Sequence, residues 1–186
     1  MSDYRAVVIG GSAGSFSLML RLLSGLKEDF RLPIILCMHR LKHVRSGIAE
    51  SMRLKSKLPI IEPVDKQRIE PRAVYLAPAN YHMFVEFDET ISLSTEAVNN
   101  FCRPSIDYTL SSCAATYRDR LVGIILTGAN DDGAKGLKDI SLKGGYTIVQ
   151  DPSTAEVDTM PKSALAIMTP NELLKPEGII AFLNKL

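Results

Sequence analysis

Nine residues near the N-terminus decide the fold: Ala6-Val7-Val8-Ile9-Gly10-Gly11-Ser12-Ala13-Gly14. The apolar run predicts a strand that is buried on both faces, and the glycines predict a tight turn directly after it. Leucines at positions 18, 22, 23 and 26 then recur with the period of a helix. A buried strand, a glycine-rich turn and an amphipathic helix together begin a β-α-β unit, so this stretch predicts a parallel sheet.

The same alternation continues along the chain. Further strands are predicted at 34–38, 58–61, 73–76, 121–126 and 146–149, and further helices at 44–54, 103–117, 134–142, 161–168 and 176–186. We expect Pro104 in the first turn of its helix. The segments 84–87 and 91–94 flank Asp88-Glu89-Thr90 and predict an inserted antiparallel hairpin. The expected architecture is therefore one domain over residues 1–186, with a doubly wound, mainly parallel α/β sheet and helices on both faces.

Composition excludes several classes of protein. The chain has 186 residues, of which 46% are hydrophobic and 23% charged, as in a soluble globular domain. A net charge of +1 argues against a nucleic-acid partner. No apolar run approaches the roughly 20 residues of a membrane span, so we expect no membrane insertion. Three cysteines, Cys37, Cys102 and Cys113, lack metal-ligand spacing and are interpreted as reduced thiols of a cytoplasmic protein.

The turn after the first strand carries a candidate nucleophile. Gly10-Gly11-Ser12-Ala13-Gly14 matches G-x-S-x-G between a strand and a helix, which is the nucleophile-elbow arrangement. In that arrangement Ser12 is exposed for attack, and backbone N–H groups at the helix start stabilise an oxyanion. A glycine-rich turn also binds phosphate, so nucleotide binding stays an alternative, although neither common nucleotide motif is present.

Two further polar segments follow predicted strands. His39 comes directly after the strand at 34–38, and Asp131 and Asp132 follow the strand at 121–126. Because ligands bind beyond the carboxyl ends of parallel strands, we expect Ser12, His39 and one aspartate to form a Ser–His–Asp set. The alternative is that one carboxylate caps the next helix. The chain order differs from the Ser–Asp–His order of α/β-hydrolases, which disfavours that fold.

The segment after His39 is basic. His43 lies one helical turn further on, but without a glutamate the H-x-x-x-H pattern is a weak metal motif. We place His43 either on the surface or behind the residues of the site. The stretch is interpreted as a solvated helix face, with attraction of an acidic protein substrate as the alternative. Its basic residues are Arg40, Lys42, Arg45, Arg53, Lys55 and Lys57.

Motifs along nearly the whole chain resemble the catalytic domain of the bacterial chemotaxis methylesterases (CheB type), which remove methyl groups from glutamyl esters on chemoreceptors. The resemblance implies that Ser12 is the nucleophile, that His39 is the general base and acid, and that Asp132 rather than Asp131 orients His39. It also implies a site that needs no metal or organic cofactor. The matching segments are 9–14, 38–39, 74–78, 81–82, 103–107, 126–128, 132–137, 150–152, 154–155 and 160–161.

The resemblance implies a protein-glutamate methylesterase acting on the cytoplasmic domain of a methylated chemoreceptor, with deamidation of receptor glutamines possible in the same site. Some positions depart from the family pattern and leave the triad intact but alter its surroundings. The departures are Ala13 for Thr, Ser15 for Gly, Arg40-Leu41 for Met-Pro, Arg72 for Gly, Ala129-Asn130 for Met-Gly and Thr159 for Gly.

The altered 129–130 segment motivates an alternative, namely a non-catalytic signalling module that binds a receptor or kinase. Full-length members of the family carry an N-terminal receiver domain, whereas here the catalytic strand begins by residue 6. If the chain is complete, we expect constitutive activity or control by a separate regulatory partner.

Overall fold

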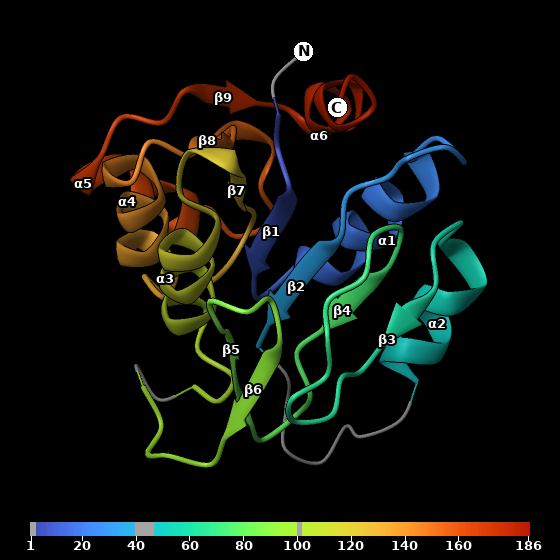
Figure 1. Cartoon of the computed structure of the whole chain (residues 1–186). Coiled ribbons are helices and arrows are strands. Elements are labelled where there is room, and N and C mark those ends of the chain that lie inside the picture. Colours follow the sequence, from blue (N-terminus) through green and yellow to red (C-terminus); the bar gives the residue numbers. More distant parts are fainter. Residues whose placement is uncertain (1–2, 40–46, 100–101) are drawn as a thin grey trace.

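A single sheet organises the computed structural model, which describes residues 3–39, 47–99 and 102–186. Within these residues, seven strands lie in the order β3-β4-β2-β1-β7-β8-β9, and every neighbouring pair is parallel (Figure 1). The predicted parallel sheet is confirmed. The strands are β1 (Ala6–Gly11), β2 (Ile34–Met38), β3 (Ile60–Ile61), β4 (Val74–Leu76), β7 (Leu121–Ile125), β8 (Tyr146–Gln150) and β9 (Glu172–Leu174).

Helices cover both faces of the sheet, as predicted (Figure 1). One face carries α1 (Ser15–Gly25), α2 (Ile48–Lys55) and α6 (Pro176–Leu183). The other carries α3 (Ile106–Tyr117), α4 (Ala134–Leu142) and α5 (Thr159–Ile167). Among the described residues, no helix is both long and apolar enough to cross a membrane.

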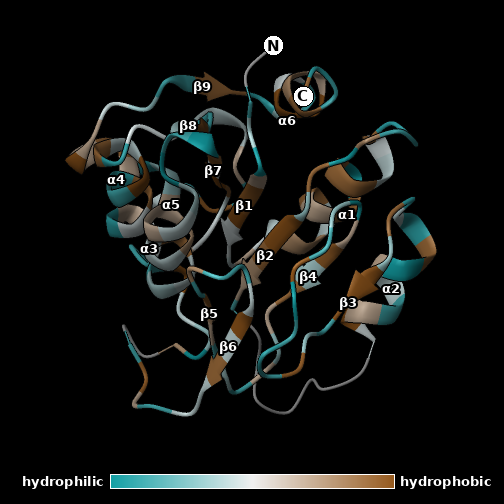
Figure 2. Cartoon of the chain, viewed as in Figure 1, coloured by the Kyte–Doolittle hydropathy of each residue, from teal (hydrophilic) through white to brown (hydrophobic). Residues whose placement is uncertain are grey.

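The continuous apolar runs of the strands follow from this layering. Along β1, Val7 and Ile9 pack with the helices α1, α2 and α6, whereas Ala6 and Val8 pack with α3 and α4. Because both faces of the sheet are covered, each strand is apolar throughout instead of alternating. Figure 2 shows this as hydrophobic colouring along the strand ribbons, with hydrophilic colouring on many of the connections.

A hairpin of β5 (His82–Val85) and β6 (Ile91–Ser94) forms a separate two-stranded sheet. Its antiparallel register pairs Val85 with Ile91, so the predicted hairpin is confirmed. The first strand ends two residues earlier than expected, because the chain turns from Glu86 onward: Glu86 N–H donates to Thr90 O at 2.9 Å. The hairpin packs its apolar side chains against α3.

Several helix boundaries differ from the prediction, including the end of α6, which lies at Leu183 instead of at residue 186. Helix α3 begins at Ile106, because the Ser105 side chain acts as its N-cap and accepts the Tyr108 N–H. Pro104 therefore precedes the helix, and the prediction that it lies in the first turn is wrong. Helix α5 begins at Thr159 and holds Pro161 in its first turn, where a missing N–H is tolerated. The predicted helix at 44–54 is observed from Ile48, and residues 44–46 lie outside the described residues.

The strand order also creates the place for a site. The chain leaves β1 toward β2 on one side and later returns to add β7 on the other side. Such a reversal opens a crevice beyond the carboxyl ends of the strands. The segments that follow β1, β2 and β7 carry Ser12, His39 and Asp132, respectively.

Candidate active site

Backbone contacts fix the turn that carries Ser12. The Ser12 N–H donates to the carbonyl oxygen of Thr127, at 2.9 Å, which ties the turn after β1 to the loop after β7. The Ser12 carbonyl accepts two hydrogen bonds from Ser15, one from its hydroxyl at 2.6 Å and one from its N–H at 2.9 Å. These bonds hold the half-buried Ser12 at the start of α1.

Gly14 allows this turn to be tight. It has a φ of 76°, in the left-handed region that side chains with a Cβ disfavour. A Cβ at this position would also lie 2.6 Å from the Cβ of Glu156. The last glycine of the predicted elbow is therefore required by both backbone geometry and packing.

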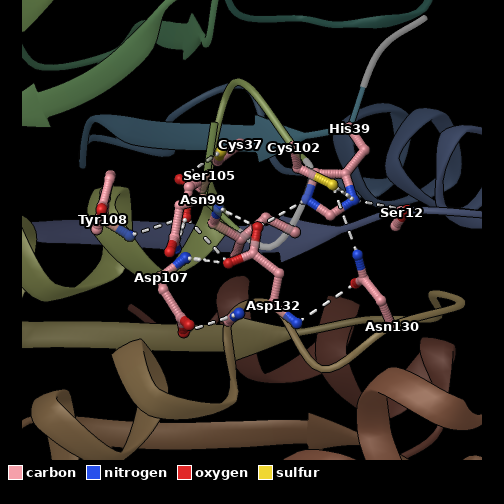
Figure 3. Close-up of polar contacts among 12 residues, drawn as sticks. Ser12, Cys37, His39, Asn99, Cys102, Ser105, Asp107, Tyr108, Asn130 and Asp132 are labelled. Atoms are coloured by element: carbon pink, nitrogen blue, oxygen red, sulfur yellow. Dashed lines mark hydrogen bonds and ion pairs between the residues drawn. The ribbon is translucent and has the colours of Figure 1, made fainter. Parts of the chain in front are cut away.

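His39 lies between the other two predicted residues (Figure 3). Its Nδ1 is 3.0 Å from Ser12 Oγ, and its Nε2 is 2.7 Å from Asp132 Oδ2. The His39 side chain is 14% exposed, so most of the ring is buried. The structure thus brings together the three residues that the sequence predicted, each from a segment following a different strand.

The carboxylate of Asp132 is completely buried at the N-terminus of α3. Burial opposes its ionisation, but the hydrogen bonds from His39, Asp107 and Ile106 outweigh burial and hold the pKa of Asp132 below its ordinary value. Its four donors are the Ser105 hydroxyl (3.0 Å), the Asp107 N–H (2.9 Å), the Ile106 N–H (2.8 Å) and His39 Nε2 (2.7 Å).

The charge of Asp132 determines the tautomer of His39. An ionised carboxylate only accepts hydrogen bonds, so Nε2 of His39 must carry the proton that it donates. In the neutral imidazole, Nδ1 is then left with a lone pair directed at the Ser12 hydroxyl. The arrangement resembles that of a serine-protease triad, but the ring presents Nδ1 to the serine instead of Nε2.

The two adjacent aspartates have different environments. Asp131 is exposed, whereas Asp132 is buried against His39. The alternative that one of them is the N-cap of α4 is wrong, because the cap residue is Gly133. The triad interpretation of Asp132 over Asp131 therefore has geometric support.

Asp107 was missed as a positioning residue. Its Oδ1 accepts the N–H groups of Gly133 and Gly136, at 2.8 and 2.9 Å. These bonds fasten the loop that carries Asp132 to α3, and burial raises the pKa of the Asp107 carboxyl. In the sequence, Asp107 appeared only as the last residue of the matching segment 103–107. Nothing there indicated that its side chain would reach the N-terminus of α4.

Cys102 was also missed. Its Sγ lies 3.5 Å from His39 Nδ1 and accepts from Asn130 Nδ2 at 3.6 Å (Figure 3). The thiol is partly exposed, whereas Cys37 and Cys113 are buried in the core. Cys102 lies in the segment before α3 and does not follow a strand of the parallel sheet. The search for polar residues directly after predicted strands therefore did not find it.

The basic stretch is only partly described. Arg40, Lys42, His43 and Arg45 lie outside the described residues, so their predicted roles stay predictions. In the described part, Arg53 Nε donates to the Ile60 carbonyl at 3.2 Å and Lys57 Nζ to the Leu26 carbonyl at 2.9 Å. These bonds brace α2 against its neighbours.

Comparisons with known proteins agree with this geometry. The family model described as CheB methylesterase matches residues 7–183. The chain is 43% identical, over 95% of its length and 92% of the relative, to a Leptospira interrogans protein named provisionally as a protein-glutamate methylesterase/protein-glutamine glutaminase. It is 34% identical to a Geobacter metallireducens protein with these two activities in its name, covering 98% of this chain but 53% of that relative.

A solved structure is similar as well. The crystal structure of the Thermotoga maritima CheB methylesterase catalytic domain superposes with a TM-score of 0.92. The two chains are 28% identical, and the match covers 98% of each. The whole α/β arrangement described above is therefore shared with that domain.

Proposed function

The chain belongs to the CheB methylesterase family, and from this premise we propose that it hydrolyses glutamyl methyl esters with Ser12 as nucleophile, His39 as base and acid, and Asp132 as the orienting carboxylate. The observation that carries the proposal is the unbroken hydrogen-bond chain from Ser12 Oγ through His39 to the buried Asp132. A serine hydroxyl becomes nucleophilic when an adjacent base is held in the correct tautomer by a third group.

Acylation uses the lone pair on Nδ1 of His39. Ser12 Oγ attacks the carbonyl carbon of the methyl ester while its proton passes to Nδ1, 3.0 Å away. The ionised Asp132 stabilises the imidazolium through Nε2–H. When the tetrahedral intermediate collapses, Nδ1 returns the proton to the methoxy oxygen, so methanol leaves and an acyl-Ser12 ester remains.

Deacylation repeats these steps with water. His39 Nδ1 takes a proton from water, the resulting hydroxide attacks the acyl-Ser12 carbonyl, and the proton returns to Ser12 Oγ. The product is a glutamate carboxylate. A glutamine side chain would pass through the same acyl-enzyme with ammonia as the leaving group, which fits the second activity in the relatives' names.

The turn after Ser12 offers an oxyanion donor. The Ala13 N–H immediately follows the nucleophile at the start of α1 and, within the described residues, donates to no other group. A backbone N–H at this position stabilises the negative oxygen of the tetrahedral intermediate. Ala13 is exposed, which leaves its N–H open to an incoming substrate carbonyl.

The substrate we propose is the methylated cytoplasmic domain of a chemoreceptor, with the chain acting in the cytoplasm as one catalytic domain over residues 1–186. Three free cysteines accord with a reducing compartment. The three residues follow the carboxyl ends of β1, β2 and β7, which is where open α/β sheets bind their ligands.

The test is methanol release from methylated receptor protein. Wild type should release methanol, and Ser12→Ala should reduce the rate to background. Ser17→Ala is the matched control, because Ser17 lies on the first turn of α1 and, among the described residues, its hydroxyl donates only to the carbonyl of Gly14, at 3.4 Å. Equal release by wild type and Ser12→Ala would refute the assignment. Tight receptor binding without turnover by wild type would instead favour the non-catalytic signalling module.

A further inference from the structure

The lone pair on Nδ1 of His39 faces two groups. Ser12 Oγ is 3.0 Å away and Cys102 Sγ is 3.5 Å away, so hydroxyl and thiol compete for one acceptor (Figure 3). The esterase mechanism uses only Ser12. A neutral imidazole nitrogen beside a cysteine sulfur is also a ligand pair for a soft divalent metal ion.

The separation of the two atoms fits such an ion. With Zn–N bonds of about 2.1 Å and Zn–S bonds of about 2.3 Å, tetrahedral geometry places nitrogen and sulfur about 3.6 Å apart. The observed separation of Nδ1 and Sγ is 3.5 Å. The geometry points to an inhibitory Zn²⁺ site formed by His39 Nδ1 and Cys102 Sγ, with the Ser12 hydroxyl or water in the remaining positions.

Asp132 supports this site without being a ligand. Its carboxylate lies near both groups, but both oxygens already accept hydrogen bonds from four donors. Metal-binding histidines generally donate their other ring N–H to a carboxylate, which fixes the tautomer that binds the ion. The Nε2–H bond to Asp132 does this for His39.

Cys102 is held in place as well. Its backbone N–H and carbonyl both bond to Asn99, at 2.8 and 3.1 Å. The Asn99 side chain in turn donates to Ser105 Oγ at 2.9 Å. On the other side, Asn130 Nδ2 lies 3.6 Å from the sulfur. The sulfur is therefore positioned beside Nδ1 before any ion arrives.

On binding, Zn²⁺ would replace the proton of the Cys102 thiol. The Cys102 thiol gives its proton to solvent, its sulfur bonds to Zn²⁺, and Nδ1 of His39 donates its lone pair to the same ion. With its lone pair occupied, His39 cannot take the proton of Ser12. This inhibition, unlike the binding, rests on the proposed function.

Binding is tested first with Co²⁺ as a spectroscopic substitute for Zn²⁺, and by equilibrium dialysis with Zn²⁺ itself. Wild type should show a thiolate-to-cobalt charge-transfer band, and Ser12→Ala should keep it because both ligands remain. Cys102→Ala should lose the band and bind Zn²⁺ at least about tenfold more weakly, since loss of even an orienting partner costs 10–100-fold. Absence of the band in wild type, or its persistence in Cys102→Ala, would overturn the site.

A second measurement does not depend on a variant. In wild type, Zn²⁺ should slow the alkylation of Cys102 by iodoacetamide, followed by peptide mass spectrometry, whereas Mg²⁺ should not. Unchanged alkylation with Zn²⁺ would overturn the site. Zn²⁺ should also suppress methanol release by wild type more strongly than by Cys102→Ala. Binding without that suppression would overturn the inhibitory role while leaving the esterase assignment intact.

Discussion

Asp132 and Ser12 contact opposite nitrogens of the same imidazole. Asp132 Oδ2 lies 2.7 Å from His39 Nε2, and Ser12 Oγ lies 3.0 Å from His39 Nδ1. Because Asp132 is fully buried and ionised, it fixes the proton on Nε2 and leaves a lone pair on Nδ1.

Replacing Asp132 should affect catalysis far more than replacing its neighbour. Asp132→Asn should lower kcat on the order of 10³–10⁴-fold, because the amide no longer enforces the productive tautomer. Asp131→Asn is the matched control, since Asp131 is exposed, and its activity should stay close to wild type. Methanol release by the two variants checks this. Similar losses in both would show that Asp132 has no special role.

Ser105 should support the triad indirectly. Its buried hydroxyl donates to Asp132 Oδ1 at 3.0 Å and caps α3. Ser105→Ala should destabilise the fold by about 1–3 kcal/mol, since the Asp132 carboxylate and the Tyr108 N–H each lose a hydrogen-bond partner. It should lower kcat by about tenfold, because orienting partners typically contribute that much.

The control for Ser105 lies on the same helix. Ser111 donates to Asp139 at 2.7 Å, away from the triad, so Ser111→Ala should leave kcat unchanged. Urea unfolding and methanol release separate the two effects. A kcat loss in Ser111→Ala equal to that in Ser105→Ala would mean that α3 stability alone determines activity.

Asp132 should also contribute to the pH dependence of stability. Because its pKa is lowered in the folded state, its stabilisation is fully present above the unfolded carboxyl value, about 3.9, and is lost as pH falls through the folded value. The free energy of unfolding of wild type should therefore exceed that of Asp132→Asn at neutral pH, and the gap should narrow below about pH 4. Urea titrations at several pH values measure it. A gap that widens on acidification would contradict the assigned direction.

Gly14 should tolerate no side chain. Gly14→Ala should lower the free energy of unfolding by about 1–2 kcal/mol, because alanine is strained in the left-handed backbone conformation of this position. The clash of the added Cβ with Glu156 should lower it further. Gly47→Ala is the matched control, because Gly47 has a φ of 98° but, among the residues that the structure describes, no atom lies within 4 Å of the added Cβ. Thermal unfolding should show the larger loss for Gly14→Ala, together with reduced activity. Equal stability losses would mean that packing against Glu156 contributes nothing.

The predictable part of the fold came from residues buried on both faces of the sheet. The apolar run 6–9 predicted β1, and the spacing of the leucines predicted α1, because both patterns are visible within a short stretch of sequence. Strand β9 was missed because Glu172–Leu174 is a short, partly exposed edge strand without an apolar run. Pro104 was misplaced because the local preference of proline gave way to the Ser105 cap.

The site was predictable where chemistry follows a strand end. Ser12 and His39 come directly after β1 and β2, so strand order alone brings their loops together. Cys102 and Asp107 depend on how α3 packs against the sheet and α4, which no local pattern in the sequence encodes. The choice between Asp131 and Asp132 likewise depends on which side chain points inward.

The central claim is that Ser12, and not Cys102, is the nucleophile served by His39. Reaction with a fluorophosphonate followed by peptide mass spectrometry tests it most directly, because Ser12 Oγ should displace fluoride and retain the phosphonyl group. We predict one adduct on Ser12 in wild type and in Cys102→Ala, and no adduct in Ser12→Ala. An adduct on Cys102, or labelling that persists in Ser12→Ala, would contradict the claim.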